Sequence, residues 1–233
     1  ESIEFGSFDV RPGVRIEVFE QERIDRLAGS TYLDKTTSAI LPGVGFISEL
    51  QGFNFFGGVH RGFTPPSSGA LKILNFGDNV SDGGLDLKSE KSWNKEIGIR
   101  GNISFIQFEY SGYHVAIEDL VAAGRGTAFK NLGKANTMGV ETKTIFNFSD
   151  LNKLFPSVDV SYSFLKTEVI EGEIISNVAG SVGNQIDISG KELPYAPSHT
   201  LMAGIYNDFG EKLSLRVDFK YVSKVYTDFE NIE

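Results

Sequence analysis

The 233-residue sequence contains no cysteine. This absence excludes disulfide frameworks, cysteine-based zinc sites and catalysis by a thiol. The sequence also lacks any run of about 18 consecutive apolar residues, which a helix needs in order to cross a membrane. Any membrane-spanning part of this chain must therefore consist of strands.

Basic residues are too few to balance the acidic ones, since 22 Lys and Arg stand against 31 Asp and Glu and leave a formal net charge of -9. Binding to nucleic acid depends on neutralising phosphates with Lys and Arg, so we expect no nucleic-acid partner. Enzyme motifs are missing as well, because the sequence has no Gly-x-Ser-x-Gly elbow, no His-Glu-x-x-His and no phosphate-binding loop. We therefore expect that the chain is not an enzyme.

What the sequence does contain is a strict alternation of apolar and polar residues. Near the end of the chain, Leu213, Leu215, Val217, Phe219 and Tyr221 alternate with Ser214, Arg216, Asp218 and Lys220. Residues 158–164 repeat the pattern. A period of two predicts strands that have one apolar face and one polar face. The 26 Gly, 19 Phe and 8 Tyr also suit a sheet protein with many turns.

Clusters of Gly, Pro, Asn and Asp divide the chain into predicted strands. These strands cover residues 3–10, 13–20, 40–48, 53–63, 92–100, 103–117, 131–148, 156–169, 193–207 and 212–227. Short connections at 11–13, 49–52, 101–102, 149–155 and 208–211 take turns with long ones at 21–39, 64–91, 118–130 and 170–192. Outer-membrane barrels have tight periplasmic turns and long extracellular loops. The alternation therefore predicts an all-β fold, an antiparallel up-and-down transmembrane β-barrel.

A soluble β binding domain is the alternative fold, because half-exposed strands of a soluble sandwich also alternate. In a membrane, ten strands with two free edges would not be tolerated. We therefore expect about ten consecutive strands of a larger barrel. The chain begins at Glu1 without a methionine or the basic and apolar segments of a signal peptide. This beginning also favours an internal piece of a longer protein.

Eight stretches of the sequence follow one another in the order found in a known family. They are PGVR (12–15), LPGVG (41–45), GGVHRGFTPPS (57–67), SWNKEIGIR (92–100), NLGKA (131–135), MGVE (138–141), LPYAPSHT (193–200) and YVSKVYTD (221–228). In these stretches the chain resembles the TonB-dependent outer-membrane receptors, and within them the branch that includes ferric citrate receptors.

The resemblance implies a barrel of about 22 strands with a plugged lumen. Residues 1–233 would be part of one barrel domain, without the plug domain and the last strands. It also implies the outer membrane of a Gram-negative bacterium, contact with its lipid, and a TonB-type energy-transducing partner. The implied function is energy-coupled, plug-gated uptake of a ferric chelate, citrate-like or a siderophore. Ferric iron would be cargo within the chelate, with no resident cofactor. A passive porin or a surface-binding barrel without energy coupling is the alternative.

Two arginines and three aspartates are candidate site residues. Arg61 and Arg125 lie at or beyond the outer ends of predicted strands, where a guanidinium could clamp the carboxylates of a metal chelate. Asp78, Asp82 and Asp86 could supply oxygen ligands to a hard cation such as calcium. Their spacing matches no EF-hand, so a solvated acidic loop is the alternative for the three aspartates.

Charged side chains on the polar faces of the predicted strands form a further candidate site. They are Arg15, Glu17, Glu96, Arg100, Glu141, Lys143, Arg216, Asp218 and Lys220. In the lumen they would steer an anionic ligand, or they would pair with each other and with the plug. Aromatic residues near the strand ends are expected either in interfacial girdles or in loop packing. These are Phe63, Trp93, Tyr195, Tyr221, Tyr226 and Phe229.

Overall fold

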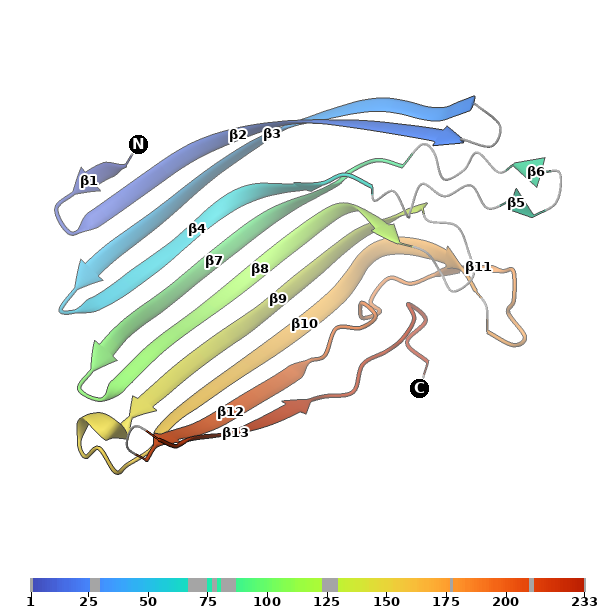
Figure 1. The fold of residues 1–233 in the computed structure, drawn as a ribbon. Helices are drawn as coiled ribbons and strands as arrows, with labels where there is room; N and C mark the ends of the chain where they lie inside the picture. The colour runs from blue at the N-terminus through green and yellow to red at the C-terminus, as the bar shows by residue number, and fades with distance from the viewer. Residues whose placement is uncertain are drawn as a thin grey trace.

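The computed structural model describes residues 2–25, 30–66, 75–76, 79–80, 87–122, 130–176, 178–209 and 212–232. Its main element is one curved antiparallel sheet (Figure 1). The strands lie in the order β1 (Ile3–Phe5), β2 (Phe8–Asp25), β3 (Ser30–Leu50), β4 (Phe53–Thr64), β7 (Glu90–Ile103), β8 (Ile106–Ala122), β9 (Lys130–Asn147), β10 (Ser157–Ile175), β12 (His199–Asp208) and β13 (Ser214–Val222). Strands that are neighbours in this order pair with each other, so the predicted up-and-down arrangement is confirmed.

Three short strands lie off this path. β5 (Asn75–Phe76) and β6 (Asn79–Val80) pair with each other, and β11 (Gln185–Asp187) pairs with the end of β10. One turn of 3-10 helix, η2 (Phe148–Asp150), follows β9. Among the residues that the structure describes, no helix has the length and apolar character needed to span a membrane.

The tight connections lie together at one end of the sheet, which we call the turn end (Figure 1). Gln51 and Gly52 join β3 to β4 with φ values of 53° and 84°. Two positive φ values in succession are those of a type I′ turn, whose twist matches that of the two strands. The longer connections, β4 to β7 and β10 to β12, lie at the opposite end, which we call the loop end. The predicted separation of the connections into two ends is confirmed. A strict alternation in length is not, because only residues 26–29 separate β2 from β3 at the loop end, whereas residues 148–156 separate β9 from β10 at the turn end.

The turn predicted at residues 11–13 is wrong. β2 continues through this segment without interruption, and the turn lies at residues 6–7. Pro12 pairs with Val44 of β3, whereas β1 reaches only as far as Val10 along β2. Proline has no backbone N–H, and it is tolerated where a strand has a partner on one side only.

The long connection predicted at 21–39 is also wrong, because β2 and β3 extend into it and pair up to Asp25 and Ser30. Its polar sequence hid these strands, since a strand that leaves the membrane meets water on both faces and needs no apolar alternation. At the other extreme, β12 begins only at His199 and β13 already ends at Val222. Residues before and after these two strands belong to connections at the loop end.

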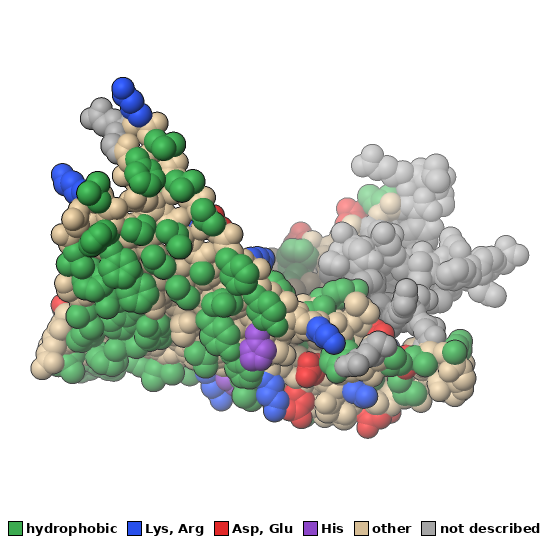
Figure 2. Space-filling model, turned by 90° about the horizontal axis from the view of Figure 1, so that it is seen from below, with side chains coloured by type: hydrophobic (Ala, Val, Ile, Leu, Met, Phe, Trp, Pro, Cys, Tyr) green, Lys and Arg blue, Asp and Glu red, His purple; other side chains and the backbone are tan. Residues whose placement is uncertain are grey.

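The strand register gives the sheet two faces of opposite character. One face, the apolar face, includes Val14, Ile16, Val44, Phe55, Val59, Ile97, Ile99, Phe108, Val140, Val158, Val160, Phe164, Leu201, Val217 and Phe219. The alternate residues form the polar face. Large apolar side chains on the apolar face are strongly exposed, with Ile16 at 70% and Val217 at 58%. An exposed apolar surface of this extent needs an apolar neighbour, and Figure 2 shows such side chains gathered together.

One glycine is required for close approach of the central strands. A Cβ atom on Gly139 of β9 would overlap the backbone oxygen of Phe164 and the ring of Tyr113. A Cβ atom on Gly112 of β8 would meet no atom closer than 3.8 Å. A side chain is therefore excluded at Gly139, whereas Gly112 leaves an empty space on the apolar face.

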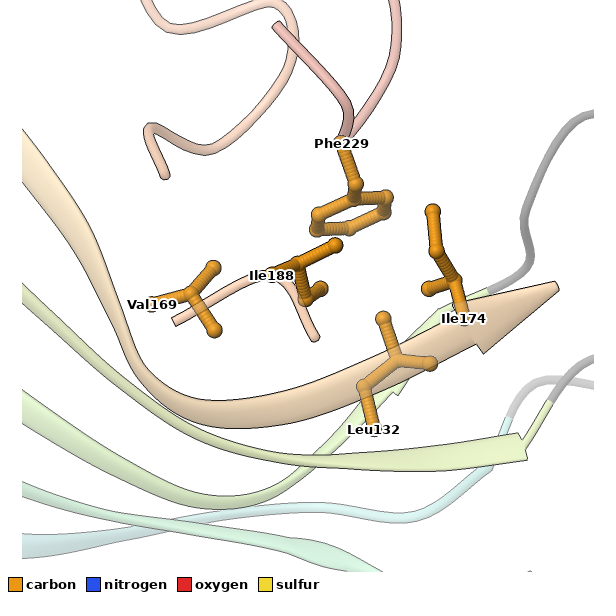
Figure 3. Packing of buried hydrophobic residues seen from close by; sticks show 5 residues of the cluster. All are labelled: Leu132, Val169, Ile174, Ile188 and Phe229. Atoms are coloured by element: carbon orange, nitrogen blue, oxygen red, sulfur yellow. The ribbon is translucent and has the colours of Figure 1, made fainter. Parts of the chain in front are cut away.

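A small hydrophobic core lies at the loop end of the sheet (Figure 3). Leu132, Val169, Ile174, Ile188 and Phe229 form this core, which we call the loop cluster. Its members come from β9, β10, the segment after β11 and the segment after β13. Ile188 is fully buried, with an exposed fraction of 0%. The loop cluster therefore fixes two connecting segments against the ends of two strands. It also places Phe229 in loop packing, one of the two predicted environments.

Candidate functional site

The charged residues predicted to face the lumen all lie on the polar face of the sheet. The strand pairing brings Arg100 of β7, Glu109 of β8 and Lys143 of β9 into one row across three neighbouring strands. Alternating charges in such a row stabilise one another through opposite-sign neighbours. Charged side chains of neighbouring strands therefore lie together on the polar face, as the two-residue periodicity of the sequence had predicted.

Several of these charges form ion pairs. Arg216 lies 3.1 Å from Asp159 on β10 and 2.8 Å from Asp218 on its own strand, and Arg15 lies 3.1 Å from Glu17. These groups are partly exposed, so each pair contributes little to stability. The prediction that the charges pair with each other is confirmed for these residues. The steering of an anionic ligand stays a prediction.

A groove of about 640 Å³ crosses the polar face near the amino-terminal strands. Its floor is rich in glycine, and its lining includes Gly43, Gly58, Arg11, Arg15 and His60. Gly43 and Gly58 allow β3 and β4 to approach closely, since a Cβ atom on either would lie 2.9 Å from an atom of the neighbouring strand. The guanidinium groups supply donors for an anion. Sequence reasoning missed this groove, although glycine at alternate positions of two adjacent predicted strands was a signal that could have revealed it.

Arg61, a predicted ligand contact, lies on the same face as Val59, since both belong to alternate positions of β4. Its guanidinium is 2.6 Å from the carboxylate of Glu118 and lies over the ring of Trp93, 5.3 Å from the ring centre. The side chain is largely buried, with 15% exposed. A ligand that used this guanidinium would have to compete with Glu118, and the role of Arg61 as a ligand contact stays a prediction.

The remaining predicted site residues, Arg125, Asp78, Asp82 and Asp86, lie outside the described residues. Within the described ranges, no three His, Asp or Glu side chains come close enough together to hold a metal ion. The proposed cation site at the three aspartates and the ligand role of Arg125 therefore stay predictions.

Polar contacts complement the loop cluster in fixing the surface at the loop end. Glu192 and Asn231 are joined by two hydrogen bonds between side chain and backbone, of 2.6 and 3.0 Å. The hydroxyl of Ser189 and its backbone N–H both donate to Asp187, and they lower the pKa of that carboxyl below its ordinary value. The connections near residues 185–193 and 223–232 thus form one continuous surface at the loop end of the sheet.

Comparison with protein families identifies this two-faced sheet. The family described as TonB dependent receptor-like, beta-barrel matches residues 1–233, the whole chain. The chain belongs to the TonB-dependent receptor-like β-barrel family. Proteins of this family lie in the outer membrane of Gram-negative bacteria, so the apolar face of the receptor sheet faces lipid. The soluble β domain considered from the sequence is thereby excluded.

Individual relatives agree with this family. The vitamin B12 transporter BtuB of Vibrio vulnificus (strain YJ016) is 28% identical over 135 residues, which are 48% of this chain and 22% of that protein. The siderophore receptor PiuA from Acinetobacter baumannii has a TM-score of 0.71 and 14% identity, over 97% of this chain and 32% of that structure. The copper transporter OprC has a TM-score of 0.68 and 17% identity, over 94% and 32%.

These similarities establish the fold of the chain but do not identify its ligand. At such identities, the two solved structures show a shared receptor fold, and the chain spans about a fifth of BtuB and about a third of each structure. The relatives are transport receptors and not enzymes. They also differ from one another in the ligand that each is named for.

Proposed function

We propose that residues 1–233 form part of the wall of a larger barrel of about 22 strands, and that the whole protein is an energy-coupled receptor for a ferric chelate. The observation that carries this proposal is the two-faced, up-and-down sheet, which the receptor family matches over the whole chain. In the described residues, β13 pairs with β12 alone. An open edge is not tolerated in lipid, so further strands of the same protein would complete the wall.

In this barrel, the polar face would line a lumen that holds a plug domain. The charged rows and the glycine-rich groove would contact the plug or a ligand that passes beside it. Release of the ligand would require movement of the plug, driven by a TonB-type partner that binds a segment outside this chain. A chain that acts in this way binds and moves its cargo without covalent chemistry, so iron enters only as part of the chelate.

A ferric chelate of the citrate or siderophore type is the proposed ligand. Such chelates carry carboxylates or other oxygen donors with negative charge, which guanidinium groups bind well. Arg11 and Arg15 supply these groups to the groove on the polar face. Arg61 and Arg125 stay proposed contacts from the sequence, although Arg61 lies on the apolar face of the sheet.

Growth under iron starvation tests this proposal. The full-length gene would be expressed in a strain without its own ferric-chelate receptors, supplied with ferric citrate or a ferric siderophore as the sole iron source. Growth on one of these chelates is expected, and it should disappear in a matched strain that lacks the energy-transducing partner. Equal growth in both strains would show passive diffusion instead, and growth on none would refute the ligand class.

A further inference from the structure

The sheet opens between β3 and β4. The two strands pair from the turn end as far as Gly43 and His60. Beyond this last pair, β3 continues to Ser30 with β2 as its only partner among the described strands, and β4 continues to Thr64 paired with β7. Figure 1 shows the β2–β3 ribbon diverging from β4 toward the loop end. We call the space between β3 and β4 on the loop-end side of Gly43 and His60 the wall gap.

The glycine-rich groove of about 640 Å³ extends through the sheet at the wall gap. Gly13 and His60 of the polar face contribute to its lining. Val14, Val44 and Phe63 of the apolar face line the same groove. Successive residues of a strand point to opposite faces of a sheet. A groove that is lined by both sets therefore reaches both sides of the wall.

The wall gap begins within the lipid-facing band of the sheet. On the loop-end side of the pair Gly13 and Gly43, apolar residues continue along the outer face of the β2–β3 ribbon. Ile16 and Ile40 pair with each other there, and each is 70% exposed. Exposed apolar side chains of this size need an apolar neighbour. Lipid therefore surrounds the ribbon at this height, and the wall gap opens sideways into lipid.

Lipid alone does not satisfy the backbone at the wall gap. A strand with a partner on one side only leaves N–H and C=O groups unpaired on the other side, and hydrocarbon offers these groups no hydrogen bond. Pro42, the first residue of β3 beyond the last pair, has no N–H to donate, as is typical of a strand position that lacks one partner. Water or another polar group must therefore reach the gap from the lumen. The gap has a polar inner side and an apolar outer lip.

Charge alone gives this groove little preference among ligands. Arg11, Arg15 and Arg61 all line it, and each lies within 3.1 Å of a carboxylate oxygen. The distinguishing feature is the combination of a polar inner side with an apolar lip. A wholly polar ligand would leave the lip uncovered, and a wholly apolar one would leave the strand edges without hydrogen bonds. A ligand with a polar head and a flexible apolar tail satisfies both parts.

We propose that the wall gap binds a ferric chelate that carries an apolar tail. The metal-binding head lies in the lumen beside the glycine-rich floor and His60. The tail passes between β3 and β4, along Val14, Val44 and Phe63, and ends in the surrounding lipid. This inference rests on the function proposed above, and it narrows the ligand from ferric chelates in general to amphiphilic ones.

Cysteine cross-linking in the full-length protein tests the geometry of the wall gap, and this chain has no cysteine of its own to interfere. Val44 and Val59 form a pair on the turn-end side of the gap. Ile40 and Phe63 would face each other if the ladder continued in the same register. Oxidation should join Val44→Cys/Val59→Cys, since facing Cβ atoms of paired strands lie about 4.5–5.5 Å apart, close to the range of a disulfide. Ile40→Cys/Phe63→Cys should need a longer bis-thiosulfonate bridge. Equal oxidation of both pairs would show a closed wall and overturn the proposal.

The bridged protein then tests the ligand. The probes are ferric citrate and ferric desferrioxamine B, each unmodified and with one dodecyl chain attached through an amide bond, labelled with radioactive iron. Binding to the Ile40→Cys/Phe63→Cys protein in phospholipid nanodiscs is measured before bridging, after bridging and after reduction of the bridge, with protein-free nanodiscs as background. Bridging should weaken binding of a dodecyl chelate about tenfold, roughly the effect of losing contact with two methylene groups. Binding of the unmodified chelate should not change, and reduction should restore the dodecyl form.

The outcomes separate this inference from the function on which it rests. Unchanged binding of the dodecyl chelates after bridging would overturn the inference, as would an equal loss for the unmodified and dodecyl forms. In both cases the proposed function would stand, because ferric chelates would still bind to the unbridged protein. Failure of the wild-type protein to bind any of the four probes would instead refute the proposed function itself.

A glycine substitution tests the position of the head without a cross-link, and it serves if the cysteine pair does not fold by heat-dependent gel mobility. Gly13→Leu fills the inner floor of the groove, and a Cβ atom there meets no atom within 4 Å. All probes that bind should weaken about fivefold or more, as overfilling of a packed site generally costs. The matched control Gly112→Leu adds the same side chain on the apolar face of β8, where a Cβ atom meets nothing closer than 3.8 Å. Unchanged binding in Gly13→Leu, or an equal loss in the control, would overturn the proposal.

Discussion

A pair of adjacent substitutions in β10 tests the assignment of the two faces most directly. Val160 lies on the apolar face between Thr144 of β9 and Ala203 of β12, near the middle of the band that runs from Val158 to Phe164. The next residue, Ser161, lies on the polar face. The two positions have nearly the same depth in the membrane. Arginine substitutions at the two positions therefore differ mainly in whether the new side chain faces lipid or the lumen.

The expected difference is large. Arginine facing lipid at the middle of the membrane costs about 2–4 kcal/mol, which lowers the folding equilibrium constant roughly 30- to 700-fold. Arginine in place of Ser161 enters a hollow of about 330 Å³ on the polar face, whose lining includes Glu109 and Glu141. Lys143 lines the same hollow and pairs directly with Ser161. Because the two carboxylates can compensate both Lys143 and the new guanidinium, we expect that Ser161→Arg changes the free energy of unfolding by less than about 1 kcal/mol.

The measurement is guanidinium unfolding of the full-length protein in phosphatidylcholine vesicles, followed by tryptophan fluorescence. Leu215→Arg serves as a control for depth. Leu215 is the second residue of β13 and pairs with Asn207 near the turn end, where arginine should cost only about 0–1 kcal/mol. Equal losses for Val160→Arg and Ser161→Arg would refute the assignment of the faces, and a larger loss for Ser161→Arg would reverse it.

Further predictions concern strand packing, the Arg61 ion pair and the loop cluster. Gly139→Ala should cost about 1–3 kcal/mol because the added methyl group overlaps backbone, whereas Gly112→Ala should be nearly neutral; the same unfolding assay measures both. A double-mutant cycle of Arg61→Ala and Glu118→Gln should give a coupling of about 1 kcal/mol or less, and a loss of chelate uptake in Arg61→Ala alone would support its ligand role. Ile188→Ala should locally destabilise the loop cluster by about 2–5 kcal/mol, seen as faster hydrogen exchange there with an intact barrel.

Strand positions inside the membrane band were predictable from the sequence. Lipid on one side and the lumen on the other impose a period of two on every strand that crosses the band, so Val217 and Arg216 could be assigned to opposite faces before the structure. The same periodicity located the charged residues of the polar face. The positions of these charged residues in the sequence follow from the points at which each strand enters and leaves the membrane.

Features that depend on distant partners could not be predicted in this way. Pro12 and Gly13 are strong local turn signals, and pairing with β3 overrides them. The glycine-rich groove forms where β3 pairs with β4, and the alternate glycines of the two strands suggest it only once that pairing is known. The loop cluster combines residues as far apart as Leu132 and Phe229, and their apolar character alone does not reveal that they meet.

The location of the hydrophobic core follows from the same physics. Within the band, lipid surrounds apolar side chains such as Ile97 and Val217, so the sheet needs no interior of its own there. β10 continues eleven residues past Phe164 to Ile175, which is roughly 37 Å along the strand at about 3.4 Å per residue. A tilt of about 40° leaves roughly 25–30 Å of height above the band. At that height water replaces lipid, and a strand end with its connections must bury apolar residues against one another to stay ordered. This is where the loop cluster lies, which explains why a membrane protein has its packed core in the part that leaves the membrane.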